Sequence, residues 1–134
     1  MKSYTDIEQS KKLAKILPIE SADMGWYYSR DPNAARNQMW VGTKAENADI
    51  PCWSLSALIQ VLPITIVDSW TDYCLMLDIK AKMPRYVKYG DVYHPEFPWD
   101  FKKQSLLDSV VESIFWLHNN NYLNGSNRSN LFNL

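Results

Sequence analysis

Three stretches of the chain carry hydrophobic residues at the spacing of one buried helix face. In the first, Thr5 and Glu8 have the pattern of a capping box, in which a hydroxyl and a carboxylate satisfy free N–H groups at a helix start. Because Pro18 cannot continue a helix, we expect this helix to cover residues 6–16. Its apolar stripe consists of Ile7, Leu13, Ala14 and Leu17.

A second helix is predicted between Pro51 and Pro63, with Ser54 as its N-cap. Trp53 and Leu58 have the spacing of a hydrophobic staple, in which one residue before the cap packs on one in the first turn. The buried stripe of this helix consists of Leu55, Leu58, Ile59 and Leu62.

A third helix is predicted to begin at Ser105, where Asp108 completes a variant of the capping box. We expect it to fray at residues 119–121, which are three consecutive asparagines. Its stripe consists of Leu107, Val110, Val111, Ile114 and Leu117.

Four short segments have the aromatic, β-branched or alternating character of strands. Residues 26–28 and 38–41 form one pair, with a turn signal at Asp31-Pro32-Asn33 between them. Residues 73–79 are nearly continuously apolar, which is typical of a strand buried on both faces. Residues 85–89 alternate in polarity, and we expect them to pair with that strand.

These elements predict an α+β protein in which three helices pack on a small, mainly antiparallel sheet, in the order α-ββ-α-ββ-α. We assign residues 1–123 to a single domain and residues 124–134, which are rich in Asn and Ser, to a flexible tail. An acidic residue, a proline and a tryptophan occur together at 49–53 and again at 96–99. A worn duplication of a ββα unit is therefore one interpretation.

The charge balance argues against several classes of partner. Fourteen Lys and Arg residues face fifteen Asp and Glu residues, so the net charge is −1 and no basic patch is visible. Proteins that bind duplex nucleic acid need such a patch, and we do not expect duplex binding here. No run approaches the ~20 apolar residues that span a bilayer. We therefore predict no membrane partner.

The two cysteines, Cys52 and Cys74, do not form a CxxC pair, so the sequence gives no support for a zinc ribbon or a thioredoxin-type site. The first residues also lack the apolar core of a signal peptide. The sequence therefore predicts a cytoplasmic protein with free thiols and without a cofactor.

Three blocks of the sequence carry a resemblance: residues 10–24, residues 50–58 and residues 106–123. The most specific is Ile50-Pro51-Cys52-Trp53-Ser54-Leu55-Ser56-Ala57-Leu58. Together they resemble a family of small, uncharacterised bacterial and prophage proteins. That family has no assigned activity. The resemblance therefore implies a compact single domain from a bacterial or phage-related setting, and it assigns no catalytic residue.

Cys52 lies near the predicted start of the second helix, where the helix dipole favours a thiolate. A cysteine-dependent hydrolase would pair it with a histidine. His94, with Asp91 or Glu96 as the orienting carboxylate, and His118 are available. No Gly-rich or Ser-Gly signature follows Cys52, however, and no oxyanion donor can be named. The other interpretation, a small buried cysteine in a hydrophobic helix start, is favoured.

Asp91, His94 and Glu96 also contain the donor atoms of a metal site. They lie in one loop with a single histidine, and nothing indicates a second shell, so a solvated polar loop is favoured and no metal site is predicted. His118 lies beside the stripe of the third helix near its C-terminus, where a cation complements the helix dipole.

Aromatic side chains crowd between residues 86 and 101, with Arg85 and Lys88 among them. Such rings fill a core, anchor a protein partner or stack on single-stranded bases. The residues that we assign to partner binding are Tyr86, Tyr89, Tyr93, Phe97 and Trp99.

The sequence thus predicts a non-enzymatic protein-interaction module of bacterial mobile-element or prophage type. Its contact surface is the aromatic segment 86–101, and its partner is another protein or a second copy of the chain. Two alternatives stay open. One is a cysteine-dependent hydrolase that uses Cys52 and His94, and the other is a protein that binds single-stranded nucleic acid through the same aromatic segment.

Overall fold

The computed structural model of this chain describes residues 2–33, 38–68, 71–88, 103 and 105–123. They fall into two compact units, one formed by Lys2–Leu58 and one that begins at Ile59. The assignment of residues 1–123 to a single domain stays a prediction, and the predicted tail lies outside the described residues.

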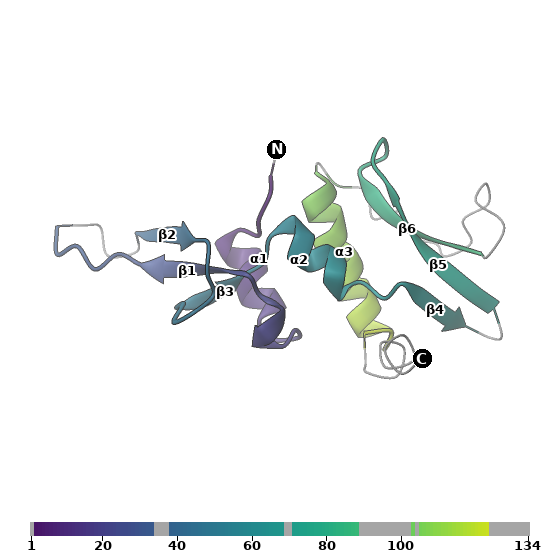
Figure 1. Cartoon of the computed structure of the whole chain (residues 1–134), viewed down its shortest axis with the longest axis horizontal. Helices are drawn as coiled ribbons and strands as arrows, with labels where there is room; N and C mark the ends of the chain where they lie inside the picture. The colour runs from purple at the N-terminus through teal and green to yellow at the C-terminus, as the bar shows by residue number, and fades with distance from the viewer. Residues whose placement is uncertain (1, 34–37, 69–70, 89–102, 104, 124–134) are drawn as a thin grey trace. The chain divides into compact units, whose positions relative to one another are not determined.

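The α+β class is confirmed. The described residues form three α-helices and two three-stranded sheets in which every pairing is antiparallel (Figure 1). The order is α-βββ-α-βββ-α, whereas the sequence predicted α-ββ-α-ββ-α. The difference is one short strand on each side of the second helix, β3 (Ile50–Cys52) and β4 (Thr65–Asp68). Strands of three or four residues are too short to show a period in the sequence.

The first helix, α1 (Ile7–Leu13), is shorter than the predicted 6–16 and is capped by different residues. The capping box consists of Asp6 and Gln9. The backbone N–H of Gln9 donates to the Asp6 carboxylate at 2.8 Å, and the N–H of Asp6 donates to the Gln9 side chain at 3.1 Å. The predicted box of Thr5 and Glu8 is therefore wrong by one residue. Aspartate and threonine are both good N-cap residues, so the residue types alone did not decide whether the box begins at Thr5 or at Asp6.

Thr5 instead joins the start of the chain to β3. Its N–H donates to the carbonyl of Trp53, and its hydroxyl accepts from the N–H of Trp53 at 3.1 Å. On either side, Leu55 N–H donates to the Ser3 carbonyl, and Tyr4 forms an isolated antiparallel bridge with Ser54. The first residues of the chain thus run along the segment that leads from β3 into the second helix.

The sheet of the first unit has the order β2-β1-β3. The central strand β1 (Met24–Tyr28) pairs with β2 (Met39–Gly42) and with β3. The first two are the strands that the sequence predicted, and the turn at Asp31-Pro32-Asn33 is also present, with the Asn33 N–H donating to the Asp31 carboxylate at 2.9 Å. Pro51, which the sequence placed before the second helix, lies in β3 opposite Gly25.

The second helix, α2 (Leu55–Val61), has the predicted N-cap. The Ser54 hydroxyl accepts from the Ala57 N–H at 3.1 Å, and Ser54 itself donates to the carboxylate of Asp23 through both its N–H and its hydroxyl. Trp53 and Leu58, the predicted staple, are fully buried. The boundary between the two compact units falls inside this helix.

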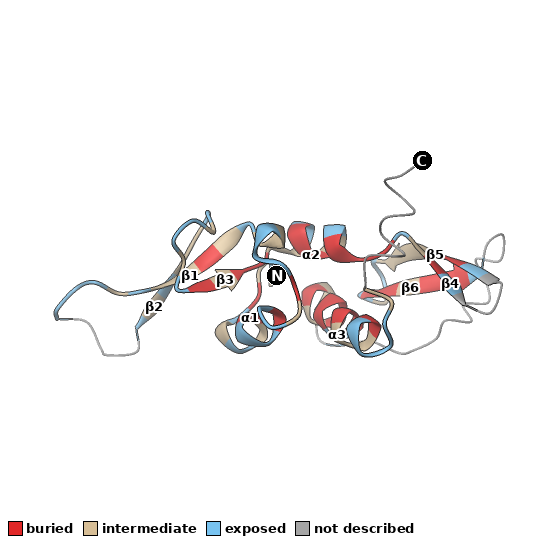
Figure 2. Cartoon of the chain, turned by 90° about the horizontal axis from the view of Figure 1, so that it is seen from below, coloured by how far each residue is buried: buried red, intermediate tan, exposed pale blue. Residues whose placement is uncertain are grey.

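The second unit contains β4, β5 (Thr71–Asp78) and β6 (Met83–Lys88) in that spatial order, followed by α3 (Leu106–Asn119). The predicted cap of α3 is confirmed, because the Ser105 hydroxyl accepts from the Asp108 N–H at 3.1 Å. Its predicted stripe is buried throughout, and the helix packs against β6. Figure 2 shows this face of α3 and most of β6 as buried.

Two features of the second unit differ from the prediction. The middle of β5, residues 74–77, is partly exposed, so β5 is not buried on both faces. The strand orders of the two sheets also differ, because the central strand is the first of its group in one sheet and the second in the other. The two sheets therefore do not repeat one topology, which argues against the predicted ββα duplication.

None of the helices in the described ranges has both the length and the apolar character that a bilayer crossing requires.

Candidate functional site

Cys52 is sealed inside the first unit, with none of its surface exposed. Its thiol donates to the Thr5 carbonyl at 3.4 Å and accepts from the Thr5 hydroxyl at 3.5 Å. That hydroxyl lies 2.7 Å from the hydroxyl of Ser10, which is also fully buried. Burial raises the pKa of the Cys52 thiol, and the hydrogen bonds from Thr5 and Ser10 lower it less than burial raises it.

The geometry contradicts a catalytic role for Cys52. The residue is the last of β3 and lies three positions before the first residue of α2, so the helix start does not activate it. A nucleophile needs an accessible thiolate, and this thiol is protonated and closed off. His94, the proposed base, lies outside the described residues, as do Asp91 and Glu96. These observations argue against the hydrolase hypothesis, which stays a prediction, and they place Cys52 in a buried polar cluster with Thr5 and Ser10.

No group of three or more His, Cys, Asp or Glu side chains in the described part of the chain has the arrangement of a metal site. His118 lies at the exposed end of α3, within its last turn.

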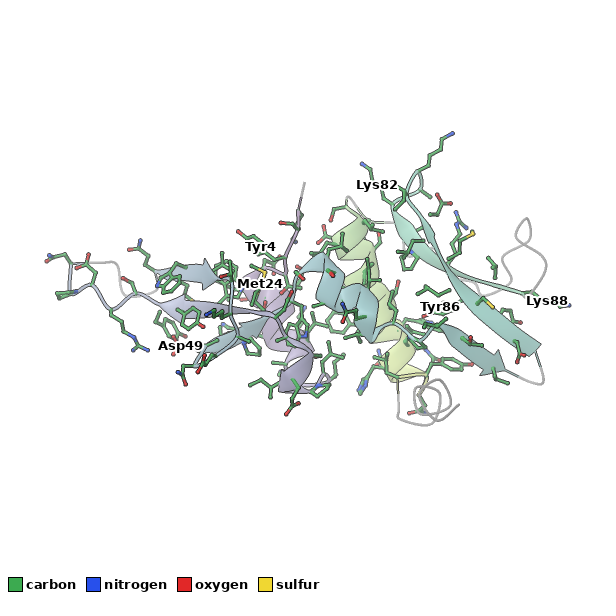
Figure 3. All side chains as sticks on the ribbon, in the orientation of Figure 1. Tyr4, Met24, Asp49, Lys82, Tyr86 and Lys88 are labelled. Carbon is green, nitrogen blue, oxygen red and sulfur yellow. The ribbon has the colours of Figure 1, made fainter. Side chains whose placement is uncertain are left out.

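Tyr86 differs from the surface residue that the sequence predicted. Only 1% of it is exposed, and its hydroxyl donates to the carbonyl of Pro63 at 2.8 Å (Figure 3). Burial raises its pKa well above the usual value for tyrosine. Tyr86 is thus a core residue that ties β6 to the segment before β4. The other predicted partner-binding residues, Tyr89, Tyr93, Phe97 and Trp99, lie outside the described residues.

Among the described residues, an exposed pair of aromatic rings lies on the outer face of the first sheet. Tyr27 of β1 and Trp40 of β2 are cross-strand neighbours, and their rings stack with centroids 4.7 Å apart and planes at 20°. Trp40 is 53% exposed. On the opposite face, Cys52 and Ile50 are buried, because side chains alternate between the two faces of a strand.

Two opposed glycines make room for this stack. Gly25 and Gly42 face one another across β1 and β2, on the same face as the two rings. A Cβ at Gly42 would lie 3.0 Å from the Tyr27 ring and 3.1 Å from the Trp40 ring. A Cβ at Gly25 would collide with Ala48, because the loop after β2 folds back over that position. The loop is held there by the Tyr27 hydroxyl, which lies within hydrogen-bond distance of the carbonyls of Lys44 and Glu46.

Beside the stack lies an open pocket of about 430 Å³. Two of its lining residues, Thr43 and Lys44, are polar and exposed. Its lining consists of Tyr27, Trp40, Val41, Gly42, Thr43 and Lys44. The pocket thus offers an aromatic wall, a glycine and a cation next to one another.

The pocket adjoins the edge of the sheet, and the hydrogen-bond pattern shows what this edge presents. The Ser29 N–H donates to the Gln38 carbonyl at 2.9 Å, one position beyond the pair Tyr28–Met39. Because bonded and non-bonded pairs alternate in an antiparallel ladder, the backbone groups of Met39 and Val41 point away from β1. Among the described residues, β2 pairs with β1 alone, so this edge is open.

The opposite edge of the same sheet is protected by a proline. Gly25 directs its backbone groups toward β2, so Pro51, which lies opposite Gly25 on β3, directs its own away from the sheet. The missing N–H of Pro51 therefore costs the ladder nothing and removes a donor from the outer edge. The first sheet has one protected edge and one open edge, and the open edge is the one beside the aromatic stack.

Comparison with protein-family models, curated proteins and solved structures finds no match to this chain. The resemblance described from the sequence therefore stays a prediction. Sequence reasoning placed residues 38–41 in a strand but did not single out Trp40. A tryptophan two residues before a glycine in a short strand was the available signal, since both side-chain positions then lie on one face.

Proposed function

We propose that this protein is a non-enzymatic protein-interaction module that binds an extended segment of a partner along the open edge of β2. The single observation that carries the proposal is the outward-facing backbone of Met39 and Val41 beside the half-exposed ring of Trp40. Strand addition of this kind derives affinity from main-chain hydrogen bonds and specificity from pockets for alternate side chains. Exposed Trp and Tyr side chains are the residue types that dominate binding energy in such contacts.

The site also suggests which partner side chains would fit. In a strand added to β2, the residue opposite Gly42 projects onto the outer face and meets the pocket beside the Trp40 ring. An apolar side chain suits that position. Lys44 also lines this pocket, so an acidic side chain close to the apolar one gains a charge-assisted contact. We therefore propose a partner segment in which an apolar residue and an acidic residue lie near each other.

The contact surface in this proposal is the edge of β2; of the aromatic segment 86–101, Tyr86 belongs to the core, and the part from residue 89 onward lies outside the described residues. The bacterial or phage-related setting is part of the proposal and depends on the sequence resemblance alone. A cytoplasmic location is supported by the two free thiols, Cys52 and Cys74, since disulfides are typical of oxidising compartments.

The test uses short random peptides displayed as a library and selected on the immobilised protein. Each selected peptide is then titrated against Val41→Pro, which removes one outward N–H, and against Val41→Ala, which shortens the same side chain but keeps the N–H. We expect affinity to fall about tenfold on Val41→Pro, the value of one hydrogen bond, relative to Val41→Ala. Trp40→Ala should weaken binding further, by about thirtyfold.

Circular dichroism and thermal unfolding of each variant show whether the sheet is intact. Peptides that bind Val41→Pro and Trp40→Ala as tightly as they bind the unmodified protein would show that the β2 edge is not the binding site. A library that yields no binder of the unmodified protein would count against the function itself.

A further inference from the structure

The second sheet has an open edge of its own. Among the described residues, β4 pairs with β5 alone. The Leu75 N–H donates to the Ile64 carbonyl at 2.8 Å, which is one position before the pair Thr65–Cys74. By the alternation of an antiparallel ladder, Ile66 directs its backbone groups toward β5, whereas Thr65 and Val67 direct theirs away from the sheet.

Pro84, on the opposite edge of the sheet, supports this assignment of inward and outward backbone groups. Leu75 directs its backbone toward β4, and so does Leu77, two residues further on. Pro84, which is opposite Leu77 on β6, therefore directs its backbone outward, where the missing N–H is tolerated. Exposed lysines flank the same strand, Lys82 just before it and Lys88 at its end (Figure 3). Proline and lysine are both common protections of a sheet edge against a further strand.

The edge at β4 lacks these protections. Its sequence, Thr-Ile-Val-Asp, contains neither proline nor lysine, and its first three residues are β-branched, which favours strand pairing. Val67 is 51% exposed and the preceding Ile64 is 59% exposed, whereas Ile66 between them is fully buried. Apolar surface and outward-facing backbone groups thus occur together at this edge.

We propose that β4 pairs with β4 of a second copy of this chain, antiparallel and centred on Ile66. The outward groups belong to Thr65 and Val67, which are symmetric about Ile66. A two-fold axis at that residue therefore places Thr65 of each copy opposite Val67 of the other. Both pairs are then hydrogen-bonded pairs, and Ile66 faces its own copy in the non-bonded pair between them.

Self-pairing leaves none of these outward groups unpaired. The donors and acceptors of Thr65 and Val67 in one copy meet those of Val67 and Thr65 in the other. Neither side chain is charged, so the pairing brings no like charges together. The exposed Val67 side chain packs against Thr65 of the second copy, on the face where both side chains lie.

The resulting sheet has six strands in the order β6-β5-β4-β4-β5-β6, and both of its outer edges are the edge protected by Pro84. Growth by further strand addition to this sheet therefore stops at two copies. The contact is short and smaller than a standard interface, so we expect a dimer that dissociates on dilution.

Sedimentation velocity over a concentration series tests the dimer. We expect the unmodified chain to pass from monomer to dimer as its concentration rises. Val67→Pro, which removes one outward N–H and leaves the bonds from β4 to β5 in place, should stay monomeric over the same series. Val67→Thr, which keeps the N–H and the β-branched shape, should still dimerise, and so should Val41→Pro on the edge of the other sheet.

A single monomeric species at every concentration overturns the proposal, and so does a Val67→Pro variant that dimerises like the unmodified chain. Loss of the dimer in Val41→Pro would assign self-association to β2 and would also contradict the proposal. If Val67→Pro fails to fold by circular dichroism, Val67→Lys replaces it. This variant keeps the N–H and introduces a charge at an exposed position, and we expect it to raise the dissociation constant at least tenfold.

Disulfide formation tests the register. Chains with Thr65→Cys are mixed with chains with Val67→Cys, all in a Cys74→Ser background because Cys74 lies opposite Thr65 in the same chain. Hydrogen-bonded pairs have Cα atoms about 5.5 Å apart, which suits a disulfide. We expect the mixture to form a covalent dimer of unlike chains faster than either variant alone. Faster cross-linking of Val67→Cys with itself would contradict the register.

Discussion

The two sheets of this protein share one design and differ in one respect. Each has a proline in an edge strand, Pro51 in β3 and Pro84 in β6, and each proline lies where its missing N–H points out of the sheet. Each sheet leaves its other edge without a proline. On β2 that edge adjoins an aromatic stack, a pocket and a lysine, whereas the residues with outward backbone groups on β4 are uncharged and symmetric about Ile66.

Because of this difference, we propose two kinds of contact. The surroundings of β2 have a defined chemistry that a foreign segment can match, with an apolar residue for the pocket and an acid for Lys44. For the edge of β4 we propose pairing with the same edge of a second copy. An open sheet edge therefore does not identify its partner, and the side chains beside it do.

The cysteines of the two units also differ in their exposure to solvent. The largest effect that we expect is the resulting difference in their rates of reaction with a thiol reagent. Cys52 is fully buried in the first unit, whereas Cys74 in the second is partly exposed. A thiol reagent under native conditions should modify Cys74 rapidly. Cys52 should react about five-thousandfold more slowly, because its exposure requires an opening that costs on the order of 5 kcal/mol.

Mass spectrometry after timed labelling measures both rates. The Cys74→Ser variant serves as the control, and it should incorporate almost no reagent until denaturant is added. Rapid labelling of Cys52 in that variant would show that the first unit is open and would revive a reactive thiol at this position.

The second prediction concerns the buried hydroxyl that anchors the first unit. Thr5→Val keeps the shape of the side chain but leaves the N–H of Trp53 and the hydroxyl of Ser10 without this partner. We expect the free energy of unfolding to fall by about 3 kcal/mol, because each buried polar group left unpaired costs about 1–3 kcal/mol. Chemical denaturation measures the change. Thr5→Ser keeps the hydroxyl and should cost about 1 kcal/mol, the value of one buried methyl group.

The third prediction is a loss of stability at high pH. Burial raises the pKa of Cys52 in the first unit and of Tyr86 in the second. The unfolded chain therefore releases these protons at a lower pH than the folded chain does. Stability is unaffected below the unfolded pKa values, about 8.5 for Cys and 10 for Tyr, and falls as the pH rises above them.

The slope of the free energy of unfolding against pH can reach about 1.4 kcal/mol per pH unit for each group that ionises only in the unfolded state. Denaturation curves from pH 7 to pH 11 measure it, and Tyr86→Phe should flatten the part above about pH 10. A slope that is the same in Tyr86→Phe and in the unmodified chain would show that Tyr86 does not contribute to it.

The smallest expected effect is that of Tyr86→Phe at neutral pH. The substitution removes the hydrogen bond from the Tyr86 hydroxyl to the Pro63 carbonyl and leaves the ring in place. We expect a loss of about 1 kcal/mol, the net value of one such bond. Denaturation at pH 7 measures it, and no change would mean that the Pro63 carbonyl finds another donor.

Much of the helical structure could be read from the chain, because its determinants are local. The stripe from Leu107 to Leu117 and the cap at Ser105 are confirmed residue by residue. The cap of α1 shows the limit of such reasoning, since Thr5 and Asp6 both satisfy the pattern. The choice of Asp6 follows from the use of Thr5 in the contact with Trp53, a residue 48 positions away.

The site could be predicted only in part. The strand at β2 was expected, but neither the exposure of Trp40 nor its stacking on Tyr27 follows from a pattern along the chain. Tyr86 was assigned to a surface because aromatic residues are common in both cores and interfaces, and its burial depends on Pro63 and on packing in the second unit. Hydrophobic character indicates that a side chain tends to be buried, but it does not identify what covers it.

By itself, the sequence determined the α+β class, the three helices, the buried face of α3, and four of the six described strands, because spacing, caps and turn residues act over a few positions. The tertiary structure alone decided that Cys52 is sealed, that Pro51 and Pro84 protect sheet edges, and that β2 and β4 are edge strands among the described residues. These properties depend on which strand lies beside which and on the phase of the hydrogen bonds between them. Both are set by contacts between residues far apart in the chain, which no local pattern encodes.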